Sequence, residues 1–452
     1  LVSIIFYFVG LILLFESFKK INLKFFLDII FIVILASFFS FFSLESDDFS
    51  YHLRSTLYFQ EDFLKNDLIN KIEDGPRVAY NSIWFLLNSL FSLNSVPSSF
   101  SFLSSVFFSC LIYDFFKEII KKDINIDLGN LYAFFSLIYL LGVLGKYKNF
   151  GSDTPGQLIL IIIIFIFLKK FNFHKKFDYQ YFILISILVV LISMIKITNI
   201  LIMPLVFLIF YKSSKKFFIS LISIIILIPF TLWIYSNYII SGCLIFPLEY
   251  TCFNNNAKAS SYNFVVSAFA KNVLKEDIPI ELSRQLVLNF GWIKYWASDH
   301  LIKIIEKNII YLLLILSPIL WIKIKSQKNQ NFLYLYNINK LKNLDNHKYI
   351  TFLLFSIFCI ICWFFLFPSF RFGSAYVFNF IIIFAIPLWI YLHQINTKTY
   401  LNFQLSLFAI SFVYFVYRNI TKIFEYLERE GNTWPMITKC SEISYSICPN
   451  IF

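Results

Sequence analysis

Charged residues are scarce in this chain of 452 residues: Asp, Glu, Lys and Arg make up 15% of it, whereas 59% is hydrophobic. Soluble globular proteins contain about 25% charged and about 45–50% apolar residues. A water-soluble fold of this length does not bury so large an apolar excess in its core. Disordered chains are excluded as well, because they are poor in aromatic residues and 21% of this chain is aromatic. The sequence therefore predicts a polytopic membrane protein.

Glycine is scarce too, with 11 residues in the whole chain. Secondary transporters use helices that are broken at Gly or Pro, and they carry ionisable residues at mid-membrane. The few charges within the apolar stretches here lie near their ends, so a transporter is disfavoured. The first apolar stretch, which begins at Leu1, lacks the basic flank and the small-residue cleavage site of a signal peptide. We interpret it as a true membrane span.

Apolar stretches predict about twelve membrane-spanning helices, with 11–13 compatible with the pattern, because a span needs about 20 apolar residues. They are 1–18, 25–44, 99–116, 129–147, 157–168, 180–195, 200–211, 217–239, 303–322, 350–367, 373–391 and 401–417. Residues 81–95 mix Asn and Ser into an apolar stretch, and we expect an interfacial or re-entrant helix there. The predicted fold class is an all-α, polytopic transmembrane helical bundle over 1–418, followed by a short tail at 419–452.

The distribution of lysine predicts the orientation of this bundle, because cytoplasmic loops are enriched in Lys and Arg. Six loops hold 20 Lys against 5 acidic residues. These loops are 19–24, 117–128, 169–179, 212–216, 323–349 and 392–400. Segment 45–98 shows the opposite balance, with 4 basic and 8 acidic residues. We therefore expect 45–98, 148–156, 240–300 and the tail on the outer face, where such long segments are expected to carry the function.

Four of the seven cysteines agree with that orientation. Cys243 with Cys252 and Cys440 with Cys448 form two close pairs in segments expected outside, where oxidising conditions permit disulfides. Free thiols in an irregular loop are the alternative. No CxxC–His pattern accompanies the pairs, which disfavours a zinc site.

Acidic residues lie at the expected membrane boundary in two outer segments. Asp47 and Asp48 directly follow a span, with His52 and Arg54 just beyond them. Adjacent side chains of an extended chain point to opposite sides, so one carboxylate faces a given cavity and the other is free to cap a helix. Asp153 lies in a second, short outer loop. A carboxylate held in this way is a candidate general base for an acceptor hydroxyl, and a plain helix cap is the alternative.

Only six arginines occur, and every one falls in a segment expected outside or at an outer boundary. Their position against the lysine bias suggests that they are needed there, and the planar guanidinium suits phosphate oxygens. Arg371 is the best candidate because it lies in a very short turn between two expected spans. Snorkelling to the interface is its alternative.

Segment 240–300 adds three further candidates: Trp292, Trp296 and His300. The two indoles are candidates for stacking on sugar faces, and the alternative is the aromatic belt at a membrane interface. With His52, Arg54 and Arg371, these residues form the predicted substrate-binding set.

These features together resemble the GT-C superfamily, which consists of polytopic glycosyltransferases that use polyprenyl-phosphate-linked sugars. An acidic pair after an early span, a long outer loop and a second Asp in the next outer loop carry the resemblance. More closely, the segments DDFSYHL, RVAYNSIW, SDTPGQL, SGCLIFPLEYTCF and PSFRFG resemble a bacterial inner-membrane family described as membrane or glycosyltransferase-like. The resemblance covers residues from about 45 to 375 and rests on the order and topology of the segments.

The resemblance implies that Asp47 or Asp48 is the catalytic base, that Asp153 is a second acidic site residue, and that Arg371 is a cation near the donor phosphate. It also implies a multi-pass protein of the bacterial inner membrane with a periplasmic active face, and inverting transfer with or without a divalent metal. No large soluble domain follows the bundle, so we expect a membrane-lipid or glycan acceptor rather than a protein. No nucleic-acid partner is expected.

Three other functions fit the same sequence. A glycan polymerase or ligase also uses outer arginines and acids, and a transporter or flippase of lipid-linked sugars would share the topology. A non-catalytic membrane scaffold is the third. Convergence of Asp47 or Asp48, Asp153 and Arg371 on one outward-facing cavity would favour the enzyme.

Overall fold

A computed structural model describes most of the helical part of the chain, and the structural statements below refer to that part. The described residues are 23–39, 52, 55–56, 81–91, 102–120, 127–142, 151–172, 177–212, 216–269, 285–286, 289–306, 308, 312, 317–318, 346–366 and 368–430. The expected span 1–18 and most of 303–322 lie outside them.

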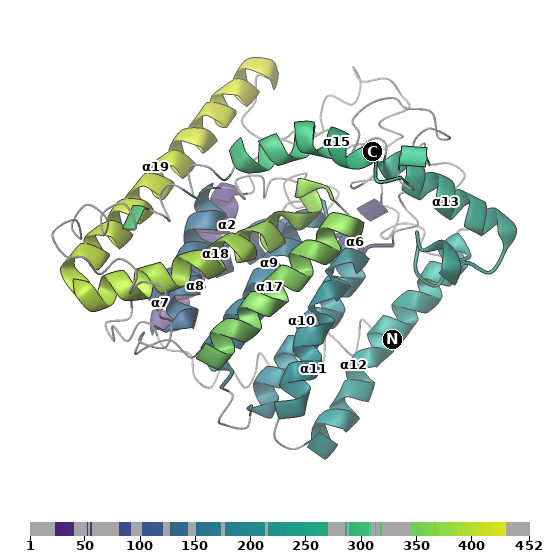
Figure 1. The fold of residues 1–452 in the computed structure, drawn as a ribbon, viewed down its shortest axis with the longest axis horizontal. Helices are drawn as coiled ribbons and strands as arrows, with labels where there is room; N and C mark the ends of the chain where they lie inside the picture. The colour runs from purple at the N-terminus through teal and green to yellow at the C-terminus, as the bar shows by residue number, and fades with distance from the viewer. Residues whose placement is uncertain are drawn as a thin grey trace.

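Thirteen α-helices and no named β-strand occur among the described residues, which confirms the all-α prediction (Figure 1). The helices are α2 (Leu23–Phe39), α6 (Ile83–Phe91), α7 (Phe102–Ile120), α8 (Leu128–Gly142), α9 (Asp153–Lys170), α10 (Tyr179–Ile195), α11 (Met203–Lys212), α12 (Lys216–Ser241), α13 (Asn255–Phe269), α15 (Trp292–Trp296), α17 (Asn346–Leu366), α18 (Phe370–Ile395) and α19 (Thr397–Glu430). Short 3-10 or π-helical segments add η3 (Ile197–Ile202), η4 (Glu249–Thr251) and η6 (Ala297–Leu301).

The expected count of twelve spans is not supported. Within the described residues, three helices are long and apolar enough to cross a membrane: Asn346–Leu366, Phe372–Ile395 and Thr397–Thr421. Four other apolar helices have 10–17 residues, fewer than the ~20 that a crossing needs. Helix α9 has 18 residues but carries one acidic and two basic side chains at its ends. Within the described residues, the structure therefore supports three candidate spans.

Helix α6 covers nine residues of the stretch 81–95. Nine helical residues extend about 14 Å, which is far less than the ~30 Å hydrocarbon core of a bilayer. The described helix is therefore too short to cross. Its buried side chains, among them Trp84 and Phe85, pack it into the bundle instead.

Helix α8 lies at the centre of the bundle. Every residue from Leu128 to Gly142 except Asn130 is buried, because α7, α9, α18 and α19 pack around it. Aromatic rings fill this core: the buried Trp389 of α18 meets Phe135 edge to face at 5.4 Å between ring centroids.

The bundle has two ends, which we name after α9 as the Asp153 end and the Lys169 end. Helices α10 and α11 form an antiparallel hairpin, since the Phe177 N–H at its base donates to the Lys212 carbonyl at 2.9 Å. The tip of this hairpin lies at the Asp153 end, where Ser82 donates to the Ile195 carbonyl at 2.8 Å. Figure 1 shows α13 and α15 lying across one end of the bundle.

Described parts of three segments that were expected on the outer face meet at the Asp153 end. Trp233 of α12 donates its indole N–H to the Asn81 carbonyl at 2.7 Å. The next residue, Ser82, binds the hairpin tip. The Trp296 indole donates to the Pro368 carbonyl, immediately before α18. One end of the bundle therefore gathers the segments in which the candidate residues lie.

Helix α17 presents two different faces. Phe352, Cys359 and Trp363 are buried against the bundle. The opposite face is apolar and exposed, with Ile350, Leu354, Phe358, Ile361 and Phe365 following one another at helical spacing. An exposed apolar stripe of this length is typical of a surface that contacts lipid.

Lys169 connects three helices at the Lys169 end. Its ammonium lies 2.7 Å from Glu118 of α7 and 3.3 Å from Asp127, which precedes α8. Burial lowers the pKa of Lys169, but hydrogen bonds and attraction from the two carboxylates outweigh it, so the pKa is raised above its ordinary value. Such a lysine stabilises the fold below its unfolded pKa, and this contribution is lost as pH rises through the folded pKa.

We expect Lys169→Met to lower the melting temperature at neutral pH, because Glu118 and Asp127 lose their shared cation. The difference in Tm from wild type should shrink as pH rises from about 10.4 through the raised folded pKa of Lys169, because the unfolded chain loses this proton first and the folded wild type loses it at higher pH. Thermal unfolding followed by circular dichroism checks this. Lys170→Met is the matched control, since the Lys170 ammonium lies over the Tyr181 ring at 4.9 Å. Equal, pH-independent losses in both variants would contradict the prediction.

Candidate functional site

Five of the nine predicted catalytic and binding residues have described side chains: His52, Asp153, Trp292, Trp296 and His300. Arg371 is described as part of the first turn of α18, without its side chain. Residues Asp47, Asp48 and Arg54 lie outside the described part of the chain, as do Cys440 and Cys448. The geometry of the site is therefore built outward from Asp153.

Asp153 is the first residue of α9 and forms an ion pair with Lys196. Both side chains are largely buried, with 14% of the Asp153 side chain and 18% of the Lys196 side chain exposed. A carboxylate in the first turn also interacts favourably with the helix dipole. Removing one partner of such a pair would leave a charge with little water around it, which is why buried charges are found paired.

Lys196 lies at the tip of the α10–α11 hairpin, where its extended backbone (φ −156°, ψ 117°) ends α10 and precedes η3. Its ammonium also lies 3.4 Å from the centroid of the Phe372 ring in the first turn of α18. This cation–π contact brings the lysine next to the backbone of Arg371. Three elements that are distant in sequence thus meet at one cation.

Polar side chains line the same junction one helical turn further in. Gln157 of α9 accepts a 2.6 Å hydrogen bond from Ser374 of α18, and both are buried. Gly156 lets the hairpin tip approach closely, because a Cβ atom there would lie 2.8 Å from the Asn199 amide nitrogen. Buried amides and hydroxyls at the end of an apolar bundle form the type of surface that orients a polar ligand.

His52 connects the first predicted outer loop to the second. It is buried (1% exposed) and its ring lies 5.3 Å from the Phe85 ring, measured between centroids. On its other side it meets Gly151, where a Cβ atom would lie 2.6 Å from the imidazole Cε1. The residue that His52 contacts, Gly151, is two positions before Asp153 in the sequence. Its burial makes it a packing residue in this structure.

Trp292, Trp296 and the neighbouring His300 do not form the expected sugar-stacking surface. The two indoles are 3% and 8% exposed and pack around Phe364 of α17, at 5.2 and 4.9 Å between ring centroids. His300 is buried too, stacked beside Trp296. The Phe364 ring covers both indoles. The Trp296 indole N–H also donates to the Pro368 carbonyl and so holds the turn before α18. They position the start of α18 rather than face a ligand.

The cysteine pair in segment 240–300 forms a disulfide between Cys243 and Cys252. It closes a short loop between α12 and α13, while Cys110, Cys359 and Cys362 are free thiols within helices. No three His, Cys, Asp or Glu side chains gather as a metal ion would require, within the residues that the structure describes.

Sequence reasoning missed Lys196, Gln157 and Ser374. A signal for Lys196 was present, since it is a lone charge at the end of the largely apolar, 17-residue helix α10 and needs a counter-charge. No local signal marked Gln157 or Ser374, because their pairing depends on how α9 and α18 pack.

The profile of a family described as a domain of unknown function (DUF8201) matches residues 1–378. No curated protein and no solved structure matches the chain. The matched region includes Asp153, Lys196 and Phe372, and it ends within α18.

We expect Gly151→Ala to destabilise the fold, because the added methyl group would overlap the His52 ring. The loss should be about 1–3 kcal/mol in the free energy of unfolding. In the double variant with His52→Ala, the added methyl group should cost much less, since the obstructing ring is gone. A double-mutant cycle by denaturant titration measures the coupling. Strictly additive losses would show that the two residues do not touch.

Replacing either partner of the Asp153–Lys196 pair should lower the stability of the fold. We expect Asp153→Asn and Lys196→Met each to lower the free energy of unfolding by about 1–3 kcal/mol, and the double variant to lose less than the sum. Lys303→Met is the control, because its pair with Asp299 is well exposed and surface pairs contribute about 0–1 kcal/mol. If all three single variants lose equally little, the Asp153–Lys196 pair does not stabilise the Asp153 end.

Proposed function

The chain belongs to the DUF8201 family, whose description names no reaction, and we propose from its own residues that it is a membrane glycosyltransferase of the GT-C type. It would transfer a sugar from a polyprenyl-phosphate-linked donor to a lipid or glycan acceptor, with inversion at the anomeric carbon. One observation carries the proposal: the Asp153–Lys196 pair lies against Phe372, so a carboxylate and a cation lie beside the backbone of Arg371.

The proposal puts the protein in the bacterial inner membrane, with the Asp153 end on the periplasmic side. The exposed apolar stripe of α17 supports contact with lipid. The Cys243–Cys252 disulfide, which follows α12 at the Asp153 end, is typical of an oxidising compartment. Lysines of α9 and α11 cluster at the opposite end, as the positive-inside rule favours for a cytoplasmic face.

Lys196 would bind the donor phosphate. Its ammonium pairs with Asp153 and lies over the Phe372 ring, and a lysine ammonium is a common phosphate-binding group in proteins. The donor phosphodiester carries one negative charge, and the polyprenyl phosphate that is released carries about −1.5 to −2, so the attraction of Lys196 for the phosphate would grow during transfer. Arg371, in the adjacent turn, would supply the second cation.

In the proposed reaction, the acceptor hydroxyl gives its proton to a carboxylate, with Asp47 or Asp48 as the base and Asp153 as the second acidic residue. The acceptor oxygen forms a bond to the anomeric carbon while the bond from that carbon to the phosphate oxygen breaks. Polyprenyl phosphate leaves with the electron pair. Lys196 and Arg371 would balance the negative charge that grows on the leaving phosphate.

Sugar transfer by the purified protein tests the proposal. We expect transfer from polyprenyl-phosphate sugars to lipid and glycan acceptors, and a loss of about a hundredfold or more in Lys196→Met and in Asp47→Asn or Asp48→Asn. Asp153→Asn should lower transfer as well, because Lys196 loses the carboxylate that positions it. Radiolabelled donor and separation of lipid-linked products measure the rates.

Two matched controls lie at the same end of the protein. Glu249→Gln removes an exposed carboxylate from the disulfide loop, and Lys258→Met removes an exposed ammonium from α13. Both should retain wild-type transfer. Full transfer in Lys196→Met and in all three Asp variants would refute the site. Passage of the lipid-linked sugar across proteoliposomes without bond formation would identify a transporter instead.

A further inference from the structure

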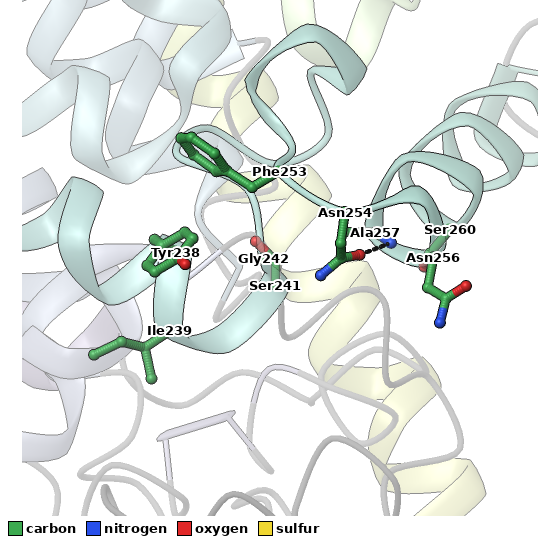
Figure 2. A pocket seen from close by; sticks show the side chains of 9 residues that line it. All are labelled: Tyr238, Ile239, Ser241, Gly242, Phe253, Asn254, Asn256, Ala257 and Ser260. Atoms are coloured by element: carbon green, nitrogen blue, oxygen red, sulfur yellow. Dashed lines mark hydrogen bonds between the residues drawn. The ribbon is translucent and has the colours of Figure 1, made fainter.

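An open cavity lies between the end of α12 and the start of α13, apart from the Asp153–Lys196 junction. Its volume of about 550 Å³ falls in the range of ~300–1,000 Å³ that is typical of small-molecule pockets. Figure 2 shows the residues around it: Tyr238 and Phe253 lie on one side of Gly242, and Asn254 and Asn256 lie on the other.

The lining of this cavity contains no charged side chain. It combines two partly exposed rings, Tyr238 and Phe253, with the amides of Asn254 and Asn256 and the hydroxyl group of Ser260. An anion or a cation would find no counter-charge here, and a purely apolar ligand would bury the amides without partners. A ligand that fits has an apolar face for the rings and neutral hydroxyl or amide groups for the asparagines.

We propose that this cavity binds a neutral sugar ring of a glycan. A pyranose presents C–H groups on one face, which pack on an aromatic ring, and hydroxyl groups at its rim, which pair with amides. The inference deepens the proposed function, on which it rests for its role: the bound sugar would belong to the acceptor glycan. Binding itself does not require that the protein be an enzyme.

The cavity is built on a rigid frame, which favours binding because little ordering is needed when a ligand enters. The Cys243–Cys252 disulfide closes the loop beside it. Across the loop, the Phe253 N–H donates to the Gly242 carbonyl at 3.1 Å and the Leu244 N–H donates to the Thr251 carbonyl at 3.0 Å. These bonds hold the backbone of Phe253, and its ring packs edge to face on Tyr238 at 5.3 Å between centroids, although 66% of the residue is exposed.

Two further features define the base of the cavity. Asn254 accepts a 2.6 Å hydrogen bond from the Ala257 N–H and so caps α13, as Figure 2 shows. Gly242 has a positive φ of 71°, and a Cβ atom there would lie 3.1 Å from the Ala257 Cβ and 3.3 Å from the Asn254 amide nitrogen. A side chain at this position would fill the space between Asn254 and the loop.

The cavity lies at the same end of the bundle as the candidate transfer site. Helix α12 leads to it, and the same helix contacts Asn81 through Trp233 and Ser236. Ser82, the next residue, binds the carbonyl of Ile195, which precedes Lys196. A glycan held in the cavity would therefore share one end of the protein with the Asp153–Lys196 pair.

Binding of free sugars to the full chain tests the proposal. Saturation-transfer difference NMR would use maltose, cellobiose and chitobiose as probes. The protein should be held in an amphipol, because alkyl maltoside detergents carry one of the probe sugars. We expect a saturable signal from at least one disaccharide, and affinity about five- to tenfold weaker in Phe253→Ala and in Asn256→Ala.

Tyr250→Ala is the matched control, because Tyr250 is a fully exposed aromatic residue of the same loop that does not line the cavity. It should bind as the wild type does. Absence of signal from all three sugars would overturn the proposal. So would unchanged affinity in Phe253→Ala and Asn256→Ala, or an equal loss in Tyr250→Ala, which would trace the signal to general exposure of the loop.

The outcome separates this proposal from the proposed function. Sugar binding that depends on Phe253 supports the cavity even if the wild type transfers no sugar. The opposite result is that the wild type transfers sugar, Lys196→Met does not, and the wild type shows no detectable binding of free sugars. That result would support the enzyme and overturn the sugar-binding cavity.

Discussion

A lysine at the tip of an apolar helical hairpin must find a counter-charge, because an unpaired ammonium with little water around it is strongly destabilising. Lys196 finds it in Asp153 at the start of α9, and it rests on the Phe372 ring at the start of α18. The pairing fixes where the hairpin ends, where α9 begins and how α18 approaches both. The buried pair of Gln157 and Ser374 and the contact of Gly156 with Asn199 depend on that arrangement.

Aromatic residues hold the other side of the same junction. Trp296 binds the Pro368 carbonyl, and Trp363 of α17 binds the Ser369 carbonyl at 3.0 Å. Between them these indoles occupy both carbonyls of the turn that precedes α18. The position of the Arg371 backbone therefore depends on α15 and α17 as much as on α18. Replacing either indole would move a cationic turn that the proposed reaction needs close to Lys196.

Individual residues show how far the sequence could be interpreted. The spacing and expected compartment of Cys243 and Cys252 permitted a disulfide, which the structure shows. Asp153 was expected at a boundary before an apolar run, and it is the first residue of α9, but its partner Lys196 was not predicted. Trp292 and Trp296 were assigned to sugar stacking, but their rings are covered by Phe364. A tryptophan near a predicted boundary has the same local pattern whether it faces a ligand or the core. Of the about twelve expected spans, three are supported within the described residues, because composition does not show where a helix ends.

The sequence by itself determined the all-helical class and the sorting of polar residues to the ends of apolar runs, because both follow from helical hydrogen bonding and from the cost of burying charge. Only the tertiary structure decided which of those residues meet. Lys196 pairs with Asp153, 43 residues away, and Gln157 with Ser374, 217 residues away, because packed helices bring together positions that no local pattern relates. The same packing buried the tryptophans and left Tyr238 and Phe253 around an open cavity.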